Sequence, residues 1–267
     1  ITNSFDIATL SADEADFLVL GEGEATSLEL FRTLLQGGTP AVDGVLRVGE
    51  PVDFDNLVRP VCRQLAEVPW PRLEDFNFAE YETDAVPILS SRGCIRRCAF
   101  CNDHHIYQTF RRRDPATVAE EMFWHADRGH TRFTFHDVLI NGAVRDLERL
   151  CDLIIADGRE LEWGGQGVIR KEMTPELFAK MAEAGCQSFV FGVESFSDKV
   201  LELMNKPYTR EQARTVLTAC HNAGIETIIN LIAGFPGETE SEFRHTYDFV
   251  RDHSDIIDQV ETTARPS

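Results

Sequence analysis

One stretch organises the chain: Val86-Pro-Ile-Leu-Ser-Ser-Arg-Gly-Cys94-Ile-Arg-Arg-Cys98-Ala-Phe-Cys101. The apolar run that begins at Val86 predicts a short buried strand, and the Ser-Ser-Arg-Gly that follows it predicts a turn. Three thiolates on so short a loop can bind three irons of a 4Fe–4S cluster and leave the fourth iron without a protein ligand. An iron with an open position is a place for chemistry, as the open position of a catalytic zinc site is.

The same cysteines could instead hold a structural zinc ion. Cys98 and Cys101 have the spacing of a zinc-binding pair, and His104 or His105 could supply a further ligand. The loop by itself therefore leaves two interpretations open, an iron–sulfur cluster and a zinc site.

The composition limits the class of protein. The 267 residues include 26 basic and 45 acidic side chains, which gives a formal net charge of −19 and disfavours a nucleic-acid partner. No apolar run is long enough for a membrane span and no signal-peptide pattern is present, so we expect a cytosolic protein. Seven cysteines, an odd number, do not suggest a disulfide framework. We expect four of them to be small buried hydrophobic residues: Cys62, Cys151, Cys186 and Cys220.

From Val86 onward, strand patterns alternate with amphipathic helix patterns. Two helix starts are marked by Asp114-Pro115 and Thr174-Pro175, in which a capping residue is followed by proline. The pattern predicts strands at 86–90, 131–136, 161–165, 187–193, 225–232 and 256–262, and helices at 114–128, 143–156, 174–185, 198–204, 209–223 and 239–250. Such repeated units predict an α/β fold with a parallel barrel or open barrel, and with its chemistry at the carboxyl ends of the strands.

Polar or glycine-rich motifs follow five of the predicted strands, so they should converge on one mouth of the barrel. The first strand is followed by the cysteine loop. The others supply His136 and Asp137, then Gln166 and Arg170, then Glu194 and Ser195, and lastly Asn230 and Ile232 with Gly234-Phe-Pro-Gly-Glu-Thr239.

The first 84 residues have a different pattern. Residues 17–20 predict a strand, residues 21–24 a glycine turn, and the following residues an amphipathic helix closed by Gly37-Gly38. The apolar face of this helix is formed by Leu28, Phe31, Leu34 and Leu35. Residues 39–84 are irregular and rich in proline and acidic residues, with one predicted helix near 56–66, which is typical of a linker.

The cysteine loop and the motifs after it resemble those of the radical S-adenosylmethionine (SAM) enzymes. The likeness extends from about Val86 to the end of the chain, and includes Gly192-Val-Glu-Ser195, residues 234–239 and Leu201-x-x-Met204-x-Lys206. It implies a partial (β/α) TIM-like barrel over 85–267 and SAM bound to the fourth iron of a 4Fe–4S cluster. The cluster ligands would be Cys94, Cys98 and Cys101.

The same resemblance implies which residues contact SAM. Asp137 would receive the methionine ammonium, Arg170 would pair with the carboxylate, and Glu194 would bind the ribose hydroxyls; these charges suit the ligand. His136-Asp137 departs from the commoner Gly-Gly-Glu pattern of the superfamily. The remaining contacts would be Phe100, Asn230 and Ile232 around the adenine, together with Gln166 and Ser195.

Residues 19–24 resemble the end of the Rossmann-like cobalamin-binding domain that precedes many radical SAM barrels. By this resemblance, residues 1–38 would be the end of such a domain, 39–84 a linker, and the chain a fragment. The Asp-x-His-x-x-Gly pattern that can ligate cobalt is absent from the sequence. Cobalamin is therefore a possible third cofactor, because the cobalt-ligating pattern could lie in the part of the domain before residue 1 or the domain could bind no cobalamin.

The resemblance implies an enzyme that cleaves SAM reductively to methionine and a 5′-deoxyadenosyl radical. With cobalamin, the expected net reaction is methyl transfer to an unactivated carbon of a small molecule or peptide, with flavodoxin or ferredoxin as the electron donor. The alternatives are a radical SAM cyclase or oxidoreductase and a tRNA methylthiotransferase, which should carry further cysteines and a basic module. The alternative that is not an enzyme is a zinc-stabilised barrel that binds a partner.

Overall fold

The computed structural model describes residues 15–51, 53, 58–73, 75–103 and 107–264. The chain forms two compact units, one from residues 1–69 with 105–108 and one from residues 70–104 with 109–267. Three positions named above lie outside the described residues: His104, His105 and the start of the helix predicted near 56–66. None of the helices in the described part of the chain has both the length and the apolar character needed to cross a membrane.

The first unit pairs strand β1 (Phe17–Val19) with β2 (Val45–Arg47) in antiparallel register and carries helix α2 (Gly23–Leu35). The expected apolar face of α2 is not buried within this unit, because Phe31 is 62% exposed and Leu35 87% exposed. The helix predicted near 56–66 is wrong over its described part, where residues 58–64 are irregular and only η2 (Leu65–Glu67) is helical. Pro60 explains this result, since proline lacks the N–H that a helix interior needs.

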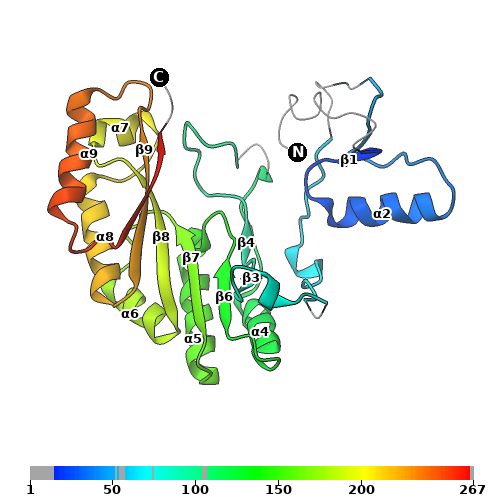
Figure 1. The fold of residues 1–267 in the computed structure, drawn as a ribbon, viewed down its shortest axis with the longest axis horizontal. Helices are drawn as coiled ribbons and strands as arrows, with labels where there is room; N and C mark the ends of the chain where they lie inside the picture. Colours follow the sequence, from blue (N-terminus) through cyan, green and yellow to red (C-terminus); the bar gives the residue numbers. More distant parts are fainter. Residues whose placement is uncertain (1–14, 52, 54–57, 74, 104–106, 265–267) are drawn as a thin grey trace. The chain divides into compact units, whose positions relative to one another are not determined.

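The second unit is built on a six-stranded parallel sheet with the strand order β10-β9-β8-β7-β6-β3 (Figure 1). The end strands β3 and β10 are not paired with each other, so the sheet is open. Its strands are β3 (Val86–Ile88), β6 (Arg132–Phe135), β7 (Glu162–Gly167), β8 (Cys186–Glu194), β9 (Glu226–Ala233) and β10 (Gln259–Ala264).

Helices follow the strands in the predicted order (Figure 1). Each predicted strand and helix from residue 86 onward is confirmed, with ends that shift by a few residues. The helix starts have the predicted caps: Asp114 accepts from the N–H of Ala116 at 2.8 Å, and Thr174 accepts from that of Leu177 at 3.4 Å. The helices are α4 (Pro115–Ala126), α5 (Val144–Asp157), α6 (Pro175–Glu183), α7 (Asp198–Leu203), α8 (Arg210–Asn222) and α9 (Glu240–Asp252), with the short η3 (Phe78–Glu80) and η4 (Ile140–Ala143).

The two faces of the sheet differ because side chains alternate along a strand. One face packs against the helices and contributes Phe135, Trp163 and Phe189 to the core. The other face is polar and lines a cavity of about 430 Å³, with Thr134 and His136 exposed on it. The parallel sheet therefore leaves its inner surface available for a ligand.

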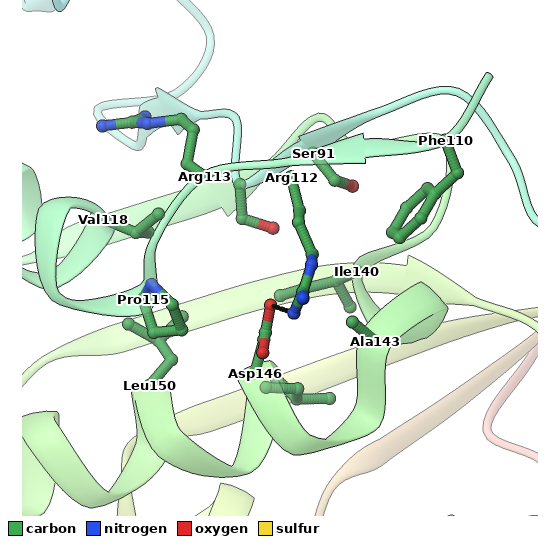
Figure 2. Close-up of a pocket in the computed structure, with 12 residues that line it drawn as sticks. Ser91, Phe110, Arg112, Arg113, Pro115, Val118, Ile140, Ala143, Asp146 and Leu150 are labelled. Carbon is green, nitrogen blue, oxygen red and sulfur yellow. Dashed lines mark hydrogen bonds and ion pairs between the residues drawn. The ribbon is translucent and has the colours of Figure 1, made fainter. Parts of the chain in front are cut away.

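Strands β4 (Ser91–Arg92) and β5 (Arg111–Arg112), which the sequence pattern did not predict, pair in antiparallel register. They hold together the two ends of the segment that carries the cysteines. Figure 2 shows Arg112 extending to Asp146 on α5, with which it forms an ion pair. The small cavity beside this pair has about 20 Å³ of room, which suits one water molecule.

Arg113 and Glu121 form a buried ion pair at 2.5 Å, with side chains 9% and 2% exposed. Arg113 is therefore buried, although a run of three arginines such as residues 111–113 is typical of a solvated stretch. Its Nη1 also donates to Leu89 O at 2.8 Å, which ties α4 to the end of β3. Burial raises the pKa of the Glu121 carboxyl, and the nearby Arg113 opposes this effect.

Replacing Glu121 by Ala should lower the free energy of unfolding by about 3–5 kcal/mol, because Arg113 is left buried without its partner. Glu120→Ala is the matched control, since the neighbouring carboxylate is exposed and should contribute within about 0.5 kcal/mol. Urea unfolding followed by circular dichroism measures both. Adding Arg113→Met to Glu121→Ala should restore part of the loss; equal losses for Glu120 and Glu121 would contradict the prediction.

Candidate site at the cysteine loop

The three cysteines of the loop are free thiols. Cys98 is buried, and Cys94 and Cys101 are half-buried. Backbone N–H groups face two of the sulfur atoms: Arg96 N donates to Cys94 Sγ at 3.3 Å, and Asp103 N donates to Cys101 Sγ at 3.4 Å. Such donors favour sulfur in its thiolate form, the form that binds metal.

Burial raises the pKa of all three thiols, that of Cys101 to about 11. The positive charge of Lys206 opposes the effect of burial at Cys94 and Cys98. A metal group on the loop would have to displace the thiol protons, as metal binding by cysteine generally does.

A cubane cluster does not require its thiolates to meet at one point, because each binds a different iron. Within the described residues, no group of three or more His, Cys, Asp or Glu side chains is arranged to hold a single metal ion. The donor chemistry of the loop fits a cluster, since three cysteines within eight residues supply thiolate ligands only. The proposed zinc ligands His104 and His105 lie outside the described residues.

Glu194 lies at the carboxyl end of β8, where the pairing with β9 has an irregular register between Gly192 and Glu194. Its backbone φ is +71°, a left-handed conformation that costs free energy for a residue with a side chain. A Cβ on Gly192 would lie 3.0 Å from Glu194 Oε1, so glycine leaves the room that this carboxylate needs. The strand end is thus shaped around Glu194.

Lys206 pairs with Glu194 in the interior. The two side chains are 3% and 11% exposed, and Lys206 Nζ lies 3.2 Å from Glu194 Oε1. Burial raises the pKa of Glu194, and Lys206 opposes this effect. The ammonium of Lys206 also lies 5.5 Å from the ring centroid of Phe100, in a cation–π contact. The structure therefore brings together Phe100, Glu194 and the loop that carries Cys98.

Asn230 lies on β9 opposite Gly192 of β8. Its Oδ1 is buried and has no hydrogen-bond partner among the described residues. A buried acceptor without a donor costs free energy, so it is well suited to a ligand that brings one. The amino group of an adenine is such a donor. Ile232, two residues further along the strand, is half-buried.

Asp137 is hydrogen-bonded within the protein. Its carboxylate is fully buried and accepts from Ser90 N at 3.0 Å, Ser90 Oγ at 2.7 Å and Ser91 Oγ at 2.5 Å. Burial raises its pKa, and the serine hydrogen bonds lower it. Both carboxylate oxygens hold the chain just before the cysteine loop, so a methionine ammonium would have to share them with the two serines.

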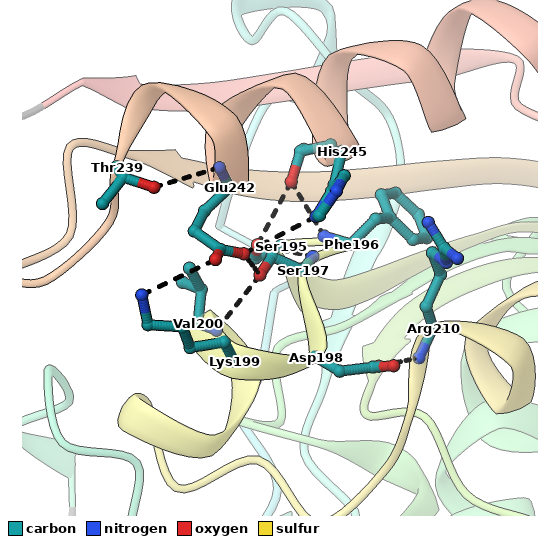
Figure 3. Close-up of polar contacts among 11 residues, drawn as sticks. Ser195, Phe196, Ser197, Asp198, Lys199, Val200, Arg210, Thr239, Glu242 and His245 are labelled. Atoms are coloured by element: carbon teal, nitrogen blue, oxygen red, sulfur yellow. Dashed lines mark hydrogen bonds and ion pairs between the residues drawn. The ribbon is translucent and has the colours of Figure 1, made fainter.

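Ser195 is also used within the protein. Its side chain is buried, its Oγ lies 3.1 Å from Thr246 Oγ1, and it accepts from Ser197 N at 3.1 Å. Figure 3 shows Ser195 and Ser197 turned toward the start of α9, where Ser197 donates to Glu242. The structure therefore shows Ser195 holding α9 against the end of β8.

Gln166 and Arg170 follow β7, but they bond to different parts of the fold. Gln166 lies on the wall of the inner cavity, and its Nε2 donates to Asp137 O at 2.9 Å. Arg170 Nη1 donates to the carbonyls of Asn141 and Gly142 at 2.9 and 2.8 Å, which holds η4 in place. Gln166 thus faces space that a ligand can enter, whereas Arg170 has contacts within the protein.

The sequence named Lys206 only as part of a motif and did not predict its buried contact with Glu194. The end of the preceding helix could have been predicted, since an asparagine such as Asn205 after an apolar helical run is a common helix stop. The buried partner of the lysine could not be read from the sequence, because Glu194 lies 12 residues away across a strand end and a helix.

The sequence matches the profile of the Radical SAM superfamily over residues 88–250. The chain belongs to this superfamily. It is 28% identical over 248 residues to an uncharacterized methyltransferase of Pyrococcus horikoshii, which covers 88% of this chain and 52% of that protein. It is 25% identical over 241 residues to the anaerobic magnesium-protoporphyrin IX monomethyl ester cyclase of Synechocystis, covering 86% of this chain and 47% of that protein.

Among solved structures, the fold is similar to that of TsrM from Kitasatospora setae, a radical SAM methyltransferase with cobalamin and a [4Fe-4S] cluster bound. The TM-score is 0.75 at 20% sequence identity, over 93% of this chain and 51% of that chain. This likeness confirms the predicted partial radical SAM barrel. The chain spans about half the length of the curated relatives it matches.

Asn230→Ala should leave the free energy of unfolding of the metal-free chain within about 0.5 kcal/mol of its original value or raise it, because it removes an acceptor without a partner. Asn141→Ala is the matched control and should cost about 1–3 kcal/mol. The Asn141 amide donates to Val168 O at 2.8 Å and accepts from Val168 N at 3.1 Å. Urea unfolding of both variants checks this. A loss at Asn230 as large as that at Asn141 would show that its amide is already satisfied.

Proposed function

We propose that the chain is the SAM-cleaving part of a cobalamin-dependent radical SAM methyltransferase. The observation that carries the proposal is the position of the three-cysteine loop, which is coupled through Lys206 to the buried carboxylate at the end of β8. A loop rich in thiolates and a carboxylate suited to a diol are what a cluster and the ribose of SAM each require.

The residues of this chain would hold the two cofactors in distinct ways. Cys94, Cys98 and Cys101 would bind three irons, and Glu194 would accept from the ribose hydroxyls. Asn230 would accept from the adenine amino group, which satisfies its buried Oδ1. Once bound and reduced, the cluster would supply the single electron that cleaves SAM.

The proposal of methyl transfer rests on the names of relatives and on the fold shared with a solved methyltransferase. A relative with 28% identity is named a methyltransferase, and the structure of TsrM, with the same fold, contains cobalamin. In this proposal, residues 1–38 are the end of a cobalamin-binding domain, 39–84 a linker, and 85–267 the barrel. The substrate is a small molecule or peptide that occupies the open inner face of the sheet, where Gln166 and His136 line the cavity.

A radical SAM cyclase is the second candidate, because one relative is named a cyclase. Both candidates use the same cofactor site, so the products distinguish them. A methyltransferase with cobalamin forms S-adenosylhomocysteine and a methylated product in addition to 5′-deoxyadenosine, whereas a cyclase forms 5′-deoxyadenosine without S-adenosylhomocysteine or a methylated product.

The proposed electron donor is a flavodoxin or ferredoxin, which delivers single electrons at low potential. We place the enzyme in the cytoplasm, because its free thiols and a cluster of this kind persist in a reducing compartment.

Anaerobic reconstitution with iron and sulfide tests the proposal. The chain should bind about four iron and four sulfide per molecule, turn brown and cleave SAM when reduced with dithionite. Cys98→Ala should abolish cluster binding, because the loop then lacks one of its three thiolates. Cys186→Ala is the matched control, since this cysteine is also buried but lies at the start of β8, and the variant should load like the original chain.

A chain that stays colourless, binds zinc stoichiometrically and never cleaves SAM would contradict the proposed function. Equal cluster loading in Cys98→Ala and Cys186→Ala would contradict the assignment of the cysteine loop as the cluster site.

A further inference from the structure

The short helix α7 ends in a Schellman motif, a turn that satisfies the last carbonyls of a helix. Lys206 N donates to Leu201 O at 2.8 Å, and Asn205 N donates to Glu202 O at 2.9 Å. Asn205 takes the left-handed φ of +59° that this motif needs, which asparagine tolerates better than most residues. The motif fixes the direction in which residues 204–206 leave the helix.

Both sides of Cys98 are hydrogen-bonded to this turn. Ala99 N donates to Met204 O at 3.0 Å. Asn205 Nδ2 donates to Arg97 O at 2.8 Å, across 108 residues of sequence. The backbone on either side of the most buried loop cysteine is therefore held by one short segment of a distant part of the chain.

The same turn places Lys206 in the interior, where its side chain is 3% exposed. Its ammonium donates to Gly192 O at 2.8 Å and to Glu194 Oε1 at 3.2 Å, which fixes the carboxylate at the end of β8. It also lies over the ring of Phe100, the residue before Cys101. One side chain thus contacts the cysteine loop and the strand end together.

We propose that residues 204–206 are a clasp that preforms the cysteine loop for its cluster, and that Lys206 is the positioning residue of this clasp. The hydrogen bonds of residues 204 and 205 hold the loop backbone, and Lys206 aligns Glu194 with it. The ammonium is also a buried positive charge beside a group that is negative once three thiolates bind it. This inference rests on the proposed function, because it takes the bound group to be the iron–sulfur cluster.

Alkylation of the metal-free full chain tests the clasp without any cofactor. Iodoacetamide modification of Cys98, followed by peptide mass spectrometry, should be roughly tenfold faster in Asn205→Ala, because this variant removes a contact that keeps the loop closed and leaves the charge of Lys206 in place. Asn205→Gly should show a smaller increase, since it keeps the left-handed turn and loses only the bond to Arg97. Unchanged, slow modification of buried Cys186 shows that each variant is folded.

Lys199→Met is the matched control, because Lys199 lies on the same helix with a side chain that is 56% exposed. Cys98 in the Lys199→Met variant should be modified at the same rate as in the original chain.

The loaded chain provides the second measurement. Cluster loss to an iron chelator should be roughly tenfold faster in Lys206→Met and Asn205→Ala than in the original chain or in Lys199→Met. The midpoint potential of the cluster should become more negative in Lys206→Met, because reduction adds negative charge where a positive charge has been removed. Lys206→Arg keeps the charge and should restore most of the potential.

The outcomes separate the two proposals. Original rates of alkylation in Asn205→Ala and of cluster loss in both Lys206→Met and Asn205→Ala would overturn the clasp. If the original chain loads its cluster in the same experiment, the proposed function stays intact. An original chain that binds no cluster would overturn the proposed function, and the alkylation rates alone would then decide whether the turn holds the loop.

Discussion

The buried ion pair between Lys206 and Glu194 is the interaction on which the geometry of the candidate site depends. It stabilises a carboxylate at a strand end whose backbone is left-handed, a conformation that persists only where the surroundings hold it. A buried charge without its partner is costly, so neither residue can change alone without affecting the other. The cysteine loop is attached to this pair through residues 204–206, which makes the loop and the strand end one structural element.

The sheet positions the cysteine loop and the end of β8, and its polar inner face lines the cavity that a ligand can enter. Several polar side chains at the strand ends serve the protein itself. Asp137 fixes the two serines before the cysteine loop, Ser195 anchors α9, and Arg170 holds η4. Their common effect is to fix the mouth of the barrel, so that Glu194, Phe100 and Asn230 are held on rigid supports rather than on free loops.

The strands and helices from residue 86 onward could be predicted from the sequence because their patterns are local: an alternating run, a capping residue, a proline at the first helical position. The cysteine loop and Glu194 could be proposed as site residues for a similar reason, since each lies in a short motif. The hydrogen bonds of Asp137 and Ser195 within the protein could not be predicted, because their partners lie 46 to 51 residues away and no local pattern shows which carboxylate or hydroxyl has such partners. The burial of Arg113 depends likewise on Glu121, which lies about two helix turns beyond the cap at Asp114.

The bond between Asn205 and Arg97 has a consequence for how the protein is made. During synthesis the three cysteines leave the ribosome about one hundred residues before the turn that holds them. Until α7 and β8 have formed, the loop lacks its supports, and its thiols are open to oxidation or to the wrong metal. A loop that is completed only by residues 204–206 favours insertion of the proposed cluster after the barrel has folded over insertion into the growing chain.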